Sequence, residues 1–106
     1  MLSKMSDRGQ IGGCIIDGPL ALDVALSKEA VEIKKLKSDV AGDADCLVFP
    51  NIESANVFYK HGSLFCPGIK MAAMVAGAKA PCVLSSRADS TETKLNSIAL
   101  AALTAK

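Results

Sequence analysis

Residues 82–90 place a serine, an arginine and an aspartate directly after a short apolar run, in the order Cys-Val-Leu-Ser-Ser-Arg-Ala-Asp-Ser. This order predicts a strand, a short polar loop and the start of a helix. Ligands of α/β proteins bind at the carboxyl ends of strands, and the free N–H groups at a helix start attract anions. Arg87 could bind a phosphate or a carboxylate through two parallel hydrogen bonds. The pattern therefore indicates a candidate anion site.

A purely structural interpretation of the same residues stays open. Either Asp89 or Ser90 could cap the helix, and Asp89 with Glu92 has the form of a capping box. In that case Arg87 would be a surface residue paired with an acidic side chain. Spacing alone does not choose between the two interpretations.

A second candidate site lies in residues 50–60, where another apolar run leads into a helix. Asn51 is placed to cap this helix. Asn56 and Lys60 are four residues apart and so share a helix face, where an amide and an ammonium could meet a phosphorylated ligand. A solvated polar face explains the same pair equally well.

The cysteines and the single histidine do not form a metal site by spacing. No C-x-x-C pair occurs among Cys14, Cys46, Cys66 and Cys82, and His61 has no second ligand nearby in the sequence. Three of the thiols lie in apolar runs, which predicts that they are buried and behave as small hydrophobic groups. Cys66 precedes a Pro-Gly pair and is expected to be the most exposed. A reducing compartment fits these thiols best.

The composition predicts one packed domain without a nucleic-acid or membrane partner. The chain has 106 residues, half of them hydrophobic, and a formal charge of +1. That charge excludes the basic surface that nucleic acid requires. The apolar stretches at 71–78 and 98–103 are too short to span a membrane, and residues 1–8 lack the apolar core of a signal peptide. We therefore expect a cytoplasmic protein.

Short apolar runs alternate with longer helical patterns along the chain. Strands are predicted over residues 11–16, 46–49, 70–75 and 82–84. Strands that alternate with helices are typical of an α/β domain with a largely parallel sheet flanked by helices. We expect residues 1–106 to form a single α/β unit.

The first helical patterns carry clear start signals. Pro19 is placed at the first position of a helix over residues 20–26. Ser27 then predicts the N-cap of the next helix, with Glu29 in its first turn, where a negative charge suits the helix dipole.

Two later helices are expected, and the last one needs a partner. A helix over residues 52–61 should end at Gly62. The final helix carries an apolar stripe at i, i+3, i+4, i+7 and i+8, which comprises Leu95, Ile98, Ala99, Ala102 and Leu103. Because no further element follows to cover this stripe, the sequence favours a homo-oligomer.

Several segments, in this order, resemble the phosphate acetyl/butyryl transferase family. They are Asp-Gly-Pro-Leu-Ala-Leu-Asp at 17–23, Val-Ala-Gly-Asp-Ala-Asp at 40–45, Val-Phe-Pro-Asn-Ile-Glu at 48–53, Tyr-Lys at 59–60, Gly-Ala-Lys-Ala-Pro at 77–81 and Ser-Arg-Ala-Asp-Ser at 86–90. The resemblance runs from about residue 6 to the last residue. The first and last of these segments are most similar to the phosphate butyryltransferase branch.

The resemblance implies an acyltransferase that uses coenzyme A and inorganic phosphate as substrates, with no covalently bound cofactor and no metal. Family members have two α/β domains of the isocitrate/isopropylmalate dehydrogenase-like type, place the active site between them and commonly dimerise. Ser86 and Arg87 match residues of that cleft and are the candidate catalytic pair: the arginine for phosphate and the serine for the carbonyl oxygen. Candidate substrate-binding residues are Asn51, Asn56, Lys60 and Asp89.

Two features depart from the family pattern. Acetyl-branch enzymes have an aspartate, proposed to deprotonate coenzyme A, where this chain has Thr93; Asp89 and Glu92 lie nearby and could substitute, and the identity of the base stays open. Family enzymes are also considerably longer, and the resemblance is to their C-terminal part. The alternative function is therefore a non-catalytic remnant that serves as a dimerisation module or as an acyl-CoA/phosphate-binding module.

Overall fold

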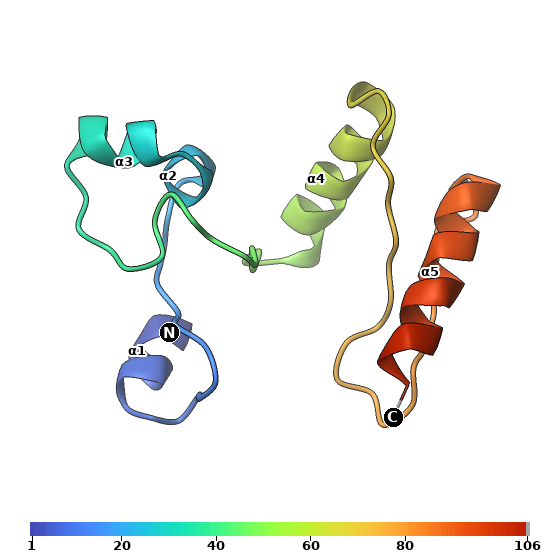
Figure 1. Cartoon of the computed structure of the whole chain (residues 1–106), viewed down its shortest axis with the longest axis horizontal. Helices are drawn as coiled ribbons and strands as arrows, with labels where there is room; N and C mark the ends of the chain where they lie inside the picture. The colour runs from blue at the N-terminus through green and yellow to red at the C-terminus, as the bar shows by residue number, and fades with distance from the viewer. Residues whose placement is uncertain (106) are drawn as a thin grey trace. The chain divides into compact units, whose positions relative to one another are not determined.

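The computed structural model describes residues 1–105 and divides the chain into two compact units, Met1–Val48 and Phe49–Lys106, here called the N-terminal and C-terminal units. Helices form the regular structure of the described residues (Figure 1). Their bounds are α1 Leu2–Asp7, α2 Leu22–Leu26, α3 Lys28–Lys34, α4 Ile52–Phe65 and α5 Thr91–Thr104.

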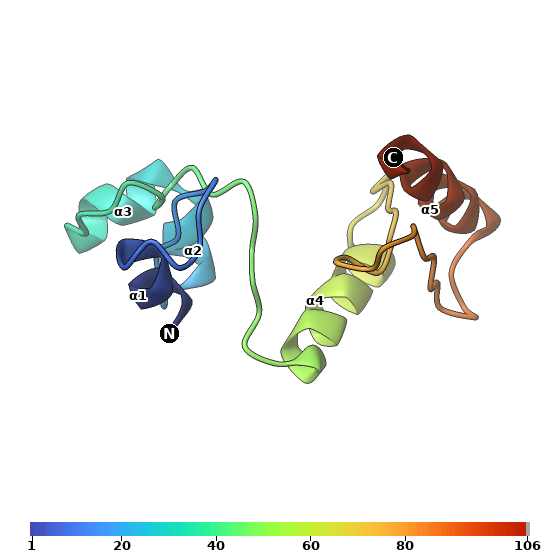
Figure 2. The same ribbon diagram turned by 90° about the horizontal axis from the view of Figure 1, so that it is seen from below.

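The N-terminal unit is organised around the corner between α2 and α3 (Figure 2). Ser27 makes this corner: its backbone N–H donates to the Asp23 carbonyl at 2.8 Å, and its hydroxyl accepts from the Ala30 N–H at 3.2 Å. The predicted cap at Ser27 is therefore confirmed. The predicted start of the preceding helix is wrong, because α2 begins at Leu22 and Pro19 lies outside it.

The loop that follows α3 returns to the end of α2. Its Gly42 N–H donates to the Val24 carbonyl at 2.8 Å, and its Ala44 N–H donates to the Ala25 carbonyl at 3.2 Å. Val24 and Ala25 are each only 4% exposed. These two backbone bonds therefore hold the loop over the buried part of the unit.

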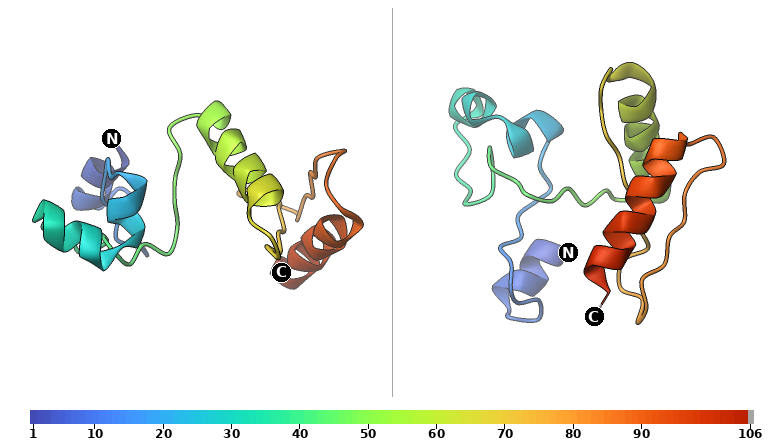
Figure 3. Two further views of the ribbon diagram at one scale, coloured as in Figure 1. Left: turned by 90° about the horizontal axis from the view of Figure 1, so that it is seen from above. Right: turned by 45° about the vertical axis from the view of Figure 1, so that its right-hand side comes forward.

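In the C-terminal unit, α4 and α5 are joined by the irregular segment 66–90 (Figure 3). The side chain of Asn51 caps α4 by accepting from the Ser54 N–H at 2.9 Å, as the sequence predicts. The predicted stop at Gly62 is wrong, since the helix continues to Phe65. A Cβ at Gly62 would lie 3.3 Å from Cδ1 of Ile69, so the glycine allows the returning chain to pack closely on the helix.

Helix α5 packs through small residues and leaves its apolar stripe exposed. Ser97 is completely buried; its hydroxyl accepts from the Ala73 N–H at 3.0 Å and donates to the Thr93 carbonyl at 2.7 Å. Ala101, one turn further along, is 7% exposed. The predicted stripe is uncovered instead, with Leu103 at 85% exposure.

The predicted strands do not pair into a sheet within residues 1–105. A single antiparallel bridge joins Val75 and Cys82, with the Val75 N–H donating to the Cys82 carbonyl at 2.9 Å. A strand is held by the N–H and C=O groups of a neighbouring strand; segments 70–75 and 82–84 meet at this one bridge alone, and segments 11–16 and 46–49 have no such neighbour in the described part of the chain. The parallel sheet and the single α/β unit thus stay predictions.

The expected burial of the cysteines is wrong. All four thiols are free and exposed, including Cys14, Cys46 and Cys82 in their apolar runs. Burial of these side chains required a sheet covered by helices, and no such sheet forms around them in residues 1–105.

Replacing Gly42 with alanine is expected to destabilise the N-terminal unit. Gly42 has a φ of +80°, and a Cβ there would lie 3.0 Å from Cα and 3.1 Å from N of Lys28. Gly13 has the same φ of +80° with nothing within 4 Å of an added Cβ, so Gly13→Ala is a matched control for backbone strain. Gly42→Ala should lower the free energy of unfolding by about 1–3 kcal/mol more than the control in urea titrations. Equal losses in the two variants would contradict this packing.

Candidate functional site

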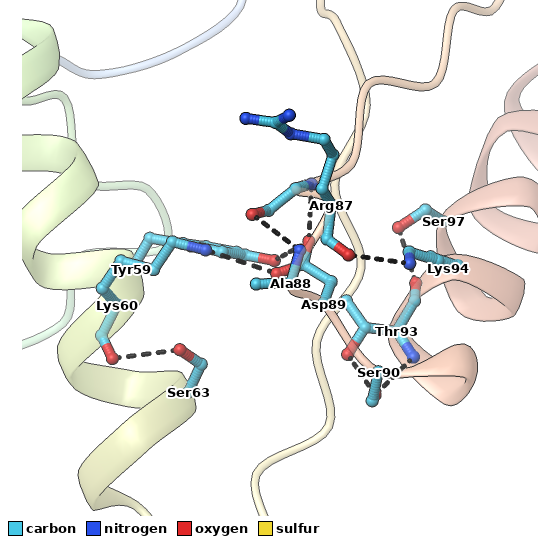
Figure 4. Close-up of polar contacts among 11 residues, drawn as sticks. Tyr59, Lys60, Ser63, Arg87, Ala88, Asp89, Ser90, Thr93, Lys94 and Ser97 are labelled. Atoms are coloured by element: carbon cyan, nitrogen blue, oxygen red, sulfur yellow. Dashed lines mark hydrogen bonds and ion pairs between the residues drawn. The ribbon is translucent and has the colours of Figure 1, made fainter.

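The centre of the candidate site is the carboxylate of Asp89, in the loop before α5. Its side chain is only 5% exposed, although the loop itself lies at the surface. Two donors come from α4, the Tyr59 hydroxyl at 3.0 Å and the Lys60 ammonium at 3.4 Å (Figure 4). The third donor is the Ser86 backbone N–H at 2.8 Å. Both carboxylate oxygens are therefore occupied.

Two consecutive residues of α4 reach the same carboxylate. The Tyr59 hydroxyl donates to one oxygen of Asp89 and the Lys60 ammonium to the other. The Lys60 ammonium also lies 5.0 Å from the centre of the Tyr59 ring, within the range of a cation–π contact. The Ser86 N–H shares an oxygen with Tyr59, and the Asp89 N–H donates back to the Ser86 carbonyl at 3.1 Å. Asp89 thus joins α4 to a closed four-residue turn.

These contacts change the pKa values of two groups in opposite directions. Burial acts to raise the pKa of Asp89, but the Ser86 N–H, the Tyr59 hydroxyl and the Lys60 ammonium outweigh it and hold that pKa below its ordinary value. The pKa of Tyr59 is raised, first by burial and then by its hydrogen bond to the negative Asp89. The site therefore favours an ionised aspartate beside a neutral tyrosine.

A cavity of about 430 Å³ adjoins this cluster. Its polar lining combines α4 side chains with those of the loop and the first turn of α5, and its apolar lining comes from α4 and the returning chain. The lining residues are Tyr59, Lys60, Ser63, Leu64, Ile69, Met71, Ser86, Ala88, Asp89, Ser90 and Thr93. Hydroxyl groups and one ammonium beside apolar side chains suit a ligand that has both a polar and an apolar part.

The structure brings together only some of the residues that the sequence singles out. Ser86, Asp89 and Lys60 line the cavity. Asn51 lines a separate open groove beside Phe49 and serves as the cap of α4, and Asn56 lies exposed on the same helix. The two asparagines therefore stay predictions that the cavity does not support.

Arg87 lies outside the cavity on the exposed side of the loop. Its guanidinium points away from the Asp89 cluster (Figure 4). Within the described residues it makes no hydrogen bond or ion pair, while its backbone carbonyl accepts from the Lys94 ammonium at 3.2 Å. The pairing of Arg87 with an acidic side chain, which the structural interpretation of residues 82–90 allowed, does not occur there.

The helix start differs from the predicted capping box. Ser90, not Asp89, is the N-cap of α5, and its hydroxyl accepts from the Thr93 N–H at 3.1 Å and donates to the Thr93 hydroxyl oxygen at 3.0 Å. The capping box of Asp89 with Glu92 does not form because the Asp89 carboxylate is engaged by α4. Its lowered pKa also makes Asp89 a weak candidate for the general base.

Tyr59 is the site residue that sequence reasoning missed. Tyr59 and Asp89 are thirty residues apart, so no local periodicity connects them. The available signal is the Tyr-Lys segment at 59–60, which belongs to the family resemblance and holds the only tyrosine of the chain, but which did not assign Tyr59 to the site.

The described residues contain neither a cluster of metal ligands nor a membrane-spanning helix. Among residues 1–105, no three His, Cys, Asp or Glu side chains gather closely enough to hold a metal ion. None of the helices in that part of the chain is long and apolar enough to cross a bilayer.

Comparison with known proteins places the chain in a family. A family model described as phosphate acetyl/butaryl transferase matches residues 1–102. The chain belongs to this family. The resemblance stated from the sequence motifs is thereby confirmed.

Individual relatives of the phosphate acetyl/butaryl transferase family agree with this assignment. A phosphate butyryltransferase of Clostridium acetobutylicum is 59% identical over 99% of the chain and 35% of its own length. A phosphate acetyltransferase of Thermotoga maritima is 54% identical over 97% of the chain and 35% of its own length. A branched-chain phosphotransacylase structure from Enterococcus faecalis V583 matches 83% of the chain and 33% of its own length, with 44% identity and a TM-score of 0.73. The chain thus spans about a third of these relatives.

The ionisation of Tyr59 offers a direct measurement of the cluster. Tyr59 is the only tyrosine and the chain has no tryptophan, so tyrosinate absorbance reports this residue alone. We expect a titration midpoint above the ordinary tyrosine pKa of about 10. Asp89→Asn should lower the midpoint because it removes the neighbouring negative charge. Glu92→Gln, which removes an exposed charge nearby, should leave it unchanged.

The same shift predicts a loss of stability at alkaline pH. Because the pKa of Tyr59 is higher in the folded state, its contribution to stability is complete below the unfolded pKa and is lost as the pH rises through the folded pKa. A midpoint at or below the ordinary value, or one that Asp89→Asn leaves unchanged, would contradict the observed hydrogen bond.

Proposed function

We propose that this chain takes part in the exchange of a short acyl group between coenzyme A and inorganic phosphate. A phosphate oxygen attacks the thioester carbonyl, the carbon–sulfur bond breaks, and the proton released from phosphate ends on the coenzyme A thiol. The observation that carries the proposal is the 59% identity to a phosphate butyryltransferase over 99% of the chain. The phosphate acetyltransferase relative supports the same chemistry with a different acyl group.

Ser86 and Arg87, which are adjacent in the sequence, have the chemistry that this reaction needs. The guanidinium of Arg87 can grip phosphate through two parallel hydrogen bonds. Ser86 is a lining residue of the cavity, and its hydroxyl oxygen accepts from the Ala88 N–H at 3.4 Å, which leaves its O–H to donate to the thioester carbonyl oxygen. A donor aimed at the developing oxyanion lowers the barrier of acyl transfer.

The proposed fold is an α/β sheet that residues 1–105 do not form by themselves. We propose that the four predicted strands pair within an isocitrate/isopropylmalate dehydrogenase-like fold of two domains. Support comes from the match of 83% of the chain to one third of a phosphotransacylase structure. The remaining contacts to coenzyme A would then come from family segments outside this match.

The proposed assembly and location follow from the exposed side chains. The uncovered stripe on α5 supports a homo-oligomer, since exposed apolar patches of this kind tend to bind a partner. The four free thiols support a reducing compartment, and we assign the chain to the cytoplasm.

An exchange assay tests the proposed function. The chain is incubated with butyryl-CoA, and the release of free thiol is followed with and without inorganic phosphate. Release that depends on phosphate and produces butyryl phosphate supports the acyltransferase. Binding of butyryl-CoA without phosphate-dependent release would favour the binding-module alternative instead.

Arg87→Lys is expected to lower turnover by about tenfold or more, which corresponds to at least about 1.4 kcal/mol of lost transition-state stabilisation. Lysine keeps the charge but not the planar pair of donors. Because Arg87 is exposed, its replacement should leave the unfolding midpoint unchanged. Arg8→Lys changes the only other arginine and is the matched control. Full activity in Arg87→Lys with unchanged phosphate dependence would remove this residue from the site.

Light scattering at tens of micromolar should find a dimer or a larger assembly. Leu95 and Ile98 are 65% and 58% exposed, so a glutamate at either position should weaken self-association through desolvation of its charge. Glu53→Gln, an exposed change on α4, serves as the control. A monodisperse monomer of the unaltered chain would refute the assembly.

A further inference from the structure

Arg87 and Asp89 have opposite charges and stand two residues apart, yet their side chains do not pair. The Asp89 carboxylate is 5% exposed and turned toward α4, where the Lys60 ammonium balances its charge at 3.4 Å. The Arg87 guanidinium points away from this cluster (Figure 4), and Arg87 is exposed. Helix α4 therefore supplies donors to the Asp89 carboxylate, so Asp89 does not need the Arg87 guanidinium as a partner.

The loop between these side chains is fixed at several atoms. The Ser86 N–H donates to the Asp89 carboxylate at 2.8 Å, and the Asp89 N–H donates to the Ser86 carbonyl at 3.1 Å. The Lys94 ammonium holds the Arg87 carbonyl at 3.2 Å from the first turns of α5. The backbone around Arg87 is thus fixed by hydrogen bonds on both sides of this residue, while the Arg87 guanidinium has no partner among residues 1–105.

We propose that Asp89 is a positioning residue that, through Tyr59, Lys60 and the Ser86 N–H, holds the loop in the conformation that leaves Arg87 open to phosphate. This inference rests on the proposed function and changes the role of Asp89 from a substrate ligand to a support for the Ser86–Arg87 pair. Its carboxylate has three donors already and little exposed surface, so it is not available to bind substrate. A buried carboxylate of this kind instead fixes the groups that donate to it.

The test measures access to Arg87 without requiring turnover. The whole chain is treated with phenylglyoxal, which modifies arginine, at increasing concentrations of inorganic phosphate. Peptide mass analysis then reads Arg87 and Arg8 separately, since these are the only arginines. Arg8 lies exposed in the N-terminal unit and is the internal control. We expect phosphate to protect Arg87 and not Arg8.

Asp89→Asn should require about tenfold more phosphate for the same protection of Arg87, because an amide cannot accept from all three donors. Glu92→Gln removes the same charge from an exposed position that, among residues 1–105, pairs with Lys70 at 3.6 Å, and it should leave the protection of Arg87 by phosphate unchanged. Tyr59→Phe removes one donor and keeps the ring, so it should give a smaller loss of protection in the same direction. Far-ultraviolet circular dichroism establishes that each variant is folded.

Three results would overturn the inference. Unchanged protection in both Asp89→Asn and Tyr59→Phe would show that the cluster is structural only. Tighter protection in Asp89→Asn would show that Asp89 competes with phosphate for Arg87. Absence of phosphate protection in the unaltered chain would show that Arg87 is not an anion site. The exchange assay is independent of these readings, so protection without acyl exchange would reject the proposed function and leave the positioning role intact.

Discussion

A carboxylate that is 95% removed from solvent must find hydrogen-bond donors, and the arrangement of the C-terminal unit follows from how Asp89 finds them. An ionised group buried without partners costs several kcal/mol. Tyr59 and Lys60 supply two donors from α4, and the third comes from the backbone of the aspartate's own turn. Loss of any one donor would leave the charge less well compensated, so α4 and the start of α5 depend on each other through this one side chain.

Short-range signals in the sequence predict local structure well. The hydroxyl of Ser27, the amide of Asn51 and the hydroxyl of Ser90 each accept from an N–H three residues later, as cap geometry requires. The capping box at Asp89 fails because a partner thirty residues away satisfies the same carboxylate. Gly62 fails as a helix stop for a related reason, since close packing of Ile69 rather than a turn explains the glycine. In both cases a contact with another part of the folded chain decides, and local sequence periodicity does not display it.

The apolar runs show a second limit of local reasoning. Residues 46–49 and 82–84 have the composition of buried strands, yet their thiols Cys46 and Cys82 are exposed within this chain. The composition of a segment indicates that it can form a strand. A sheet forms only where a second strand lies beside it. Family motifs carry different information, because they reflect the complete fold of the relatives. The six motif segments taken together therefore indicated the phosphate acetyl/butaryl transferase family, even though a sheet does not form in residues 1–105.

In our proposal, the Asp89 carboxylate fixes the backbone of the loop that carries Ser86 and Arg87. Amide hydrogen exchange at Ser86, read residue by residue by nuclear magnetic resonance, tests it most directly, because this N–H donates to the carboxylate at 2.8 Å. We expect slow exchange at Ser86 in the unaltered chain and exchange at least about tenfold faster in Asp89→Asn. Protection at Ala73, whose N–H donates to buried Ser97, should stay the same and shows that the unit remains folded. Equal exchange rates at Ser86 in the unaltered chain and in Asp89→Asn would contradict this positioning role of Asp89.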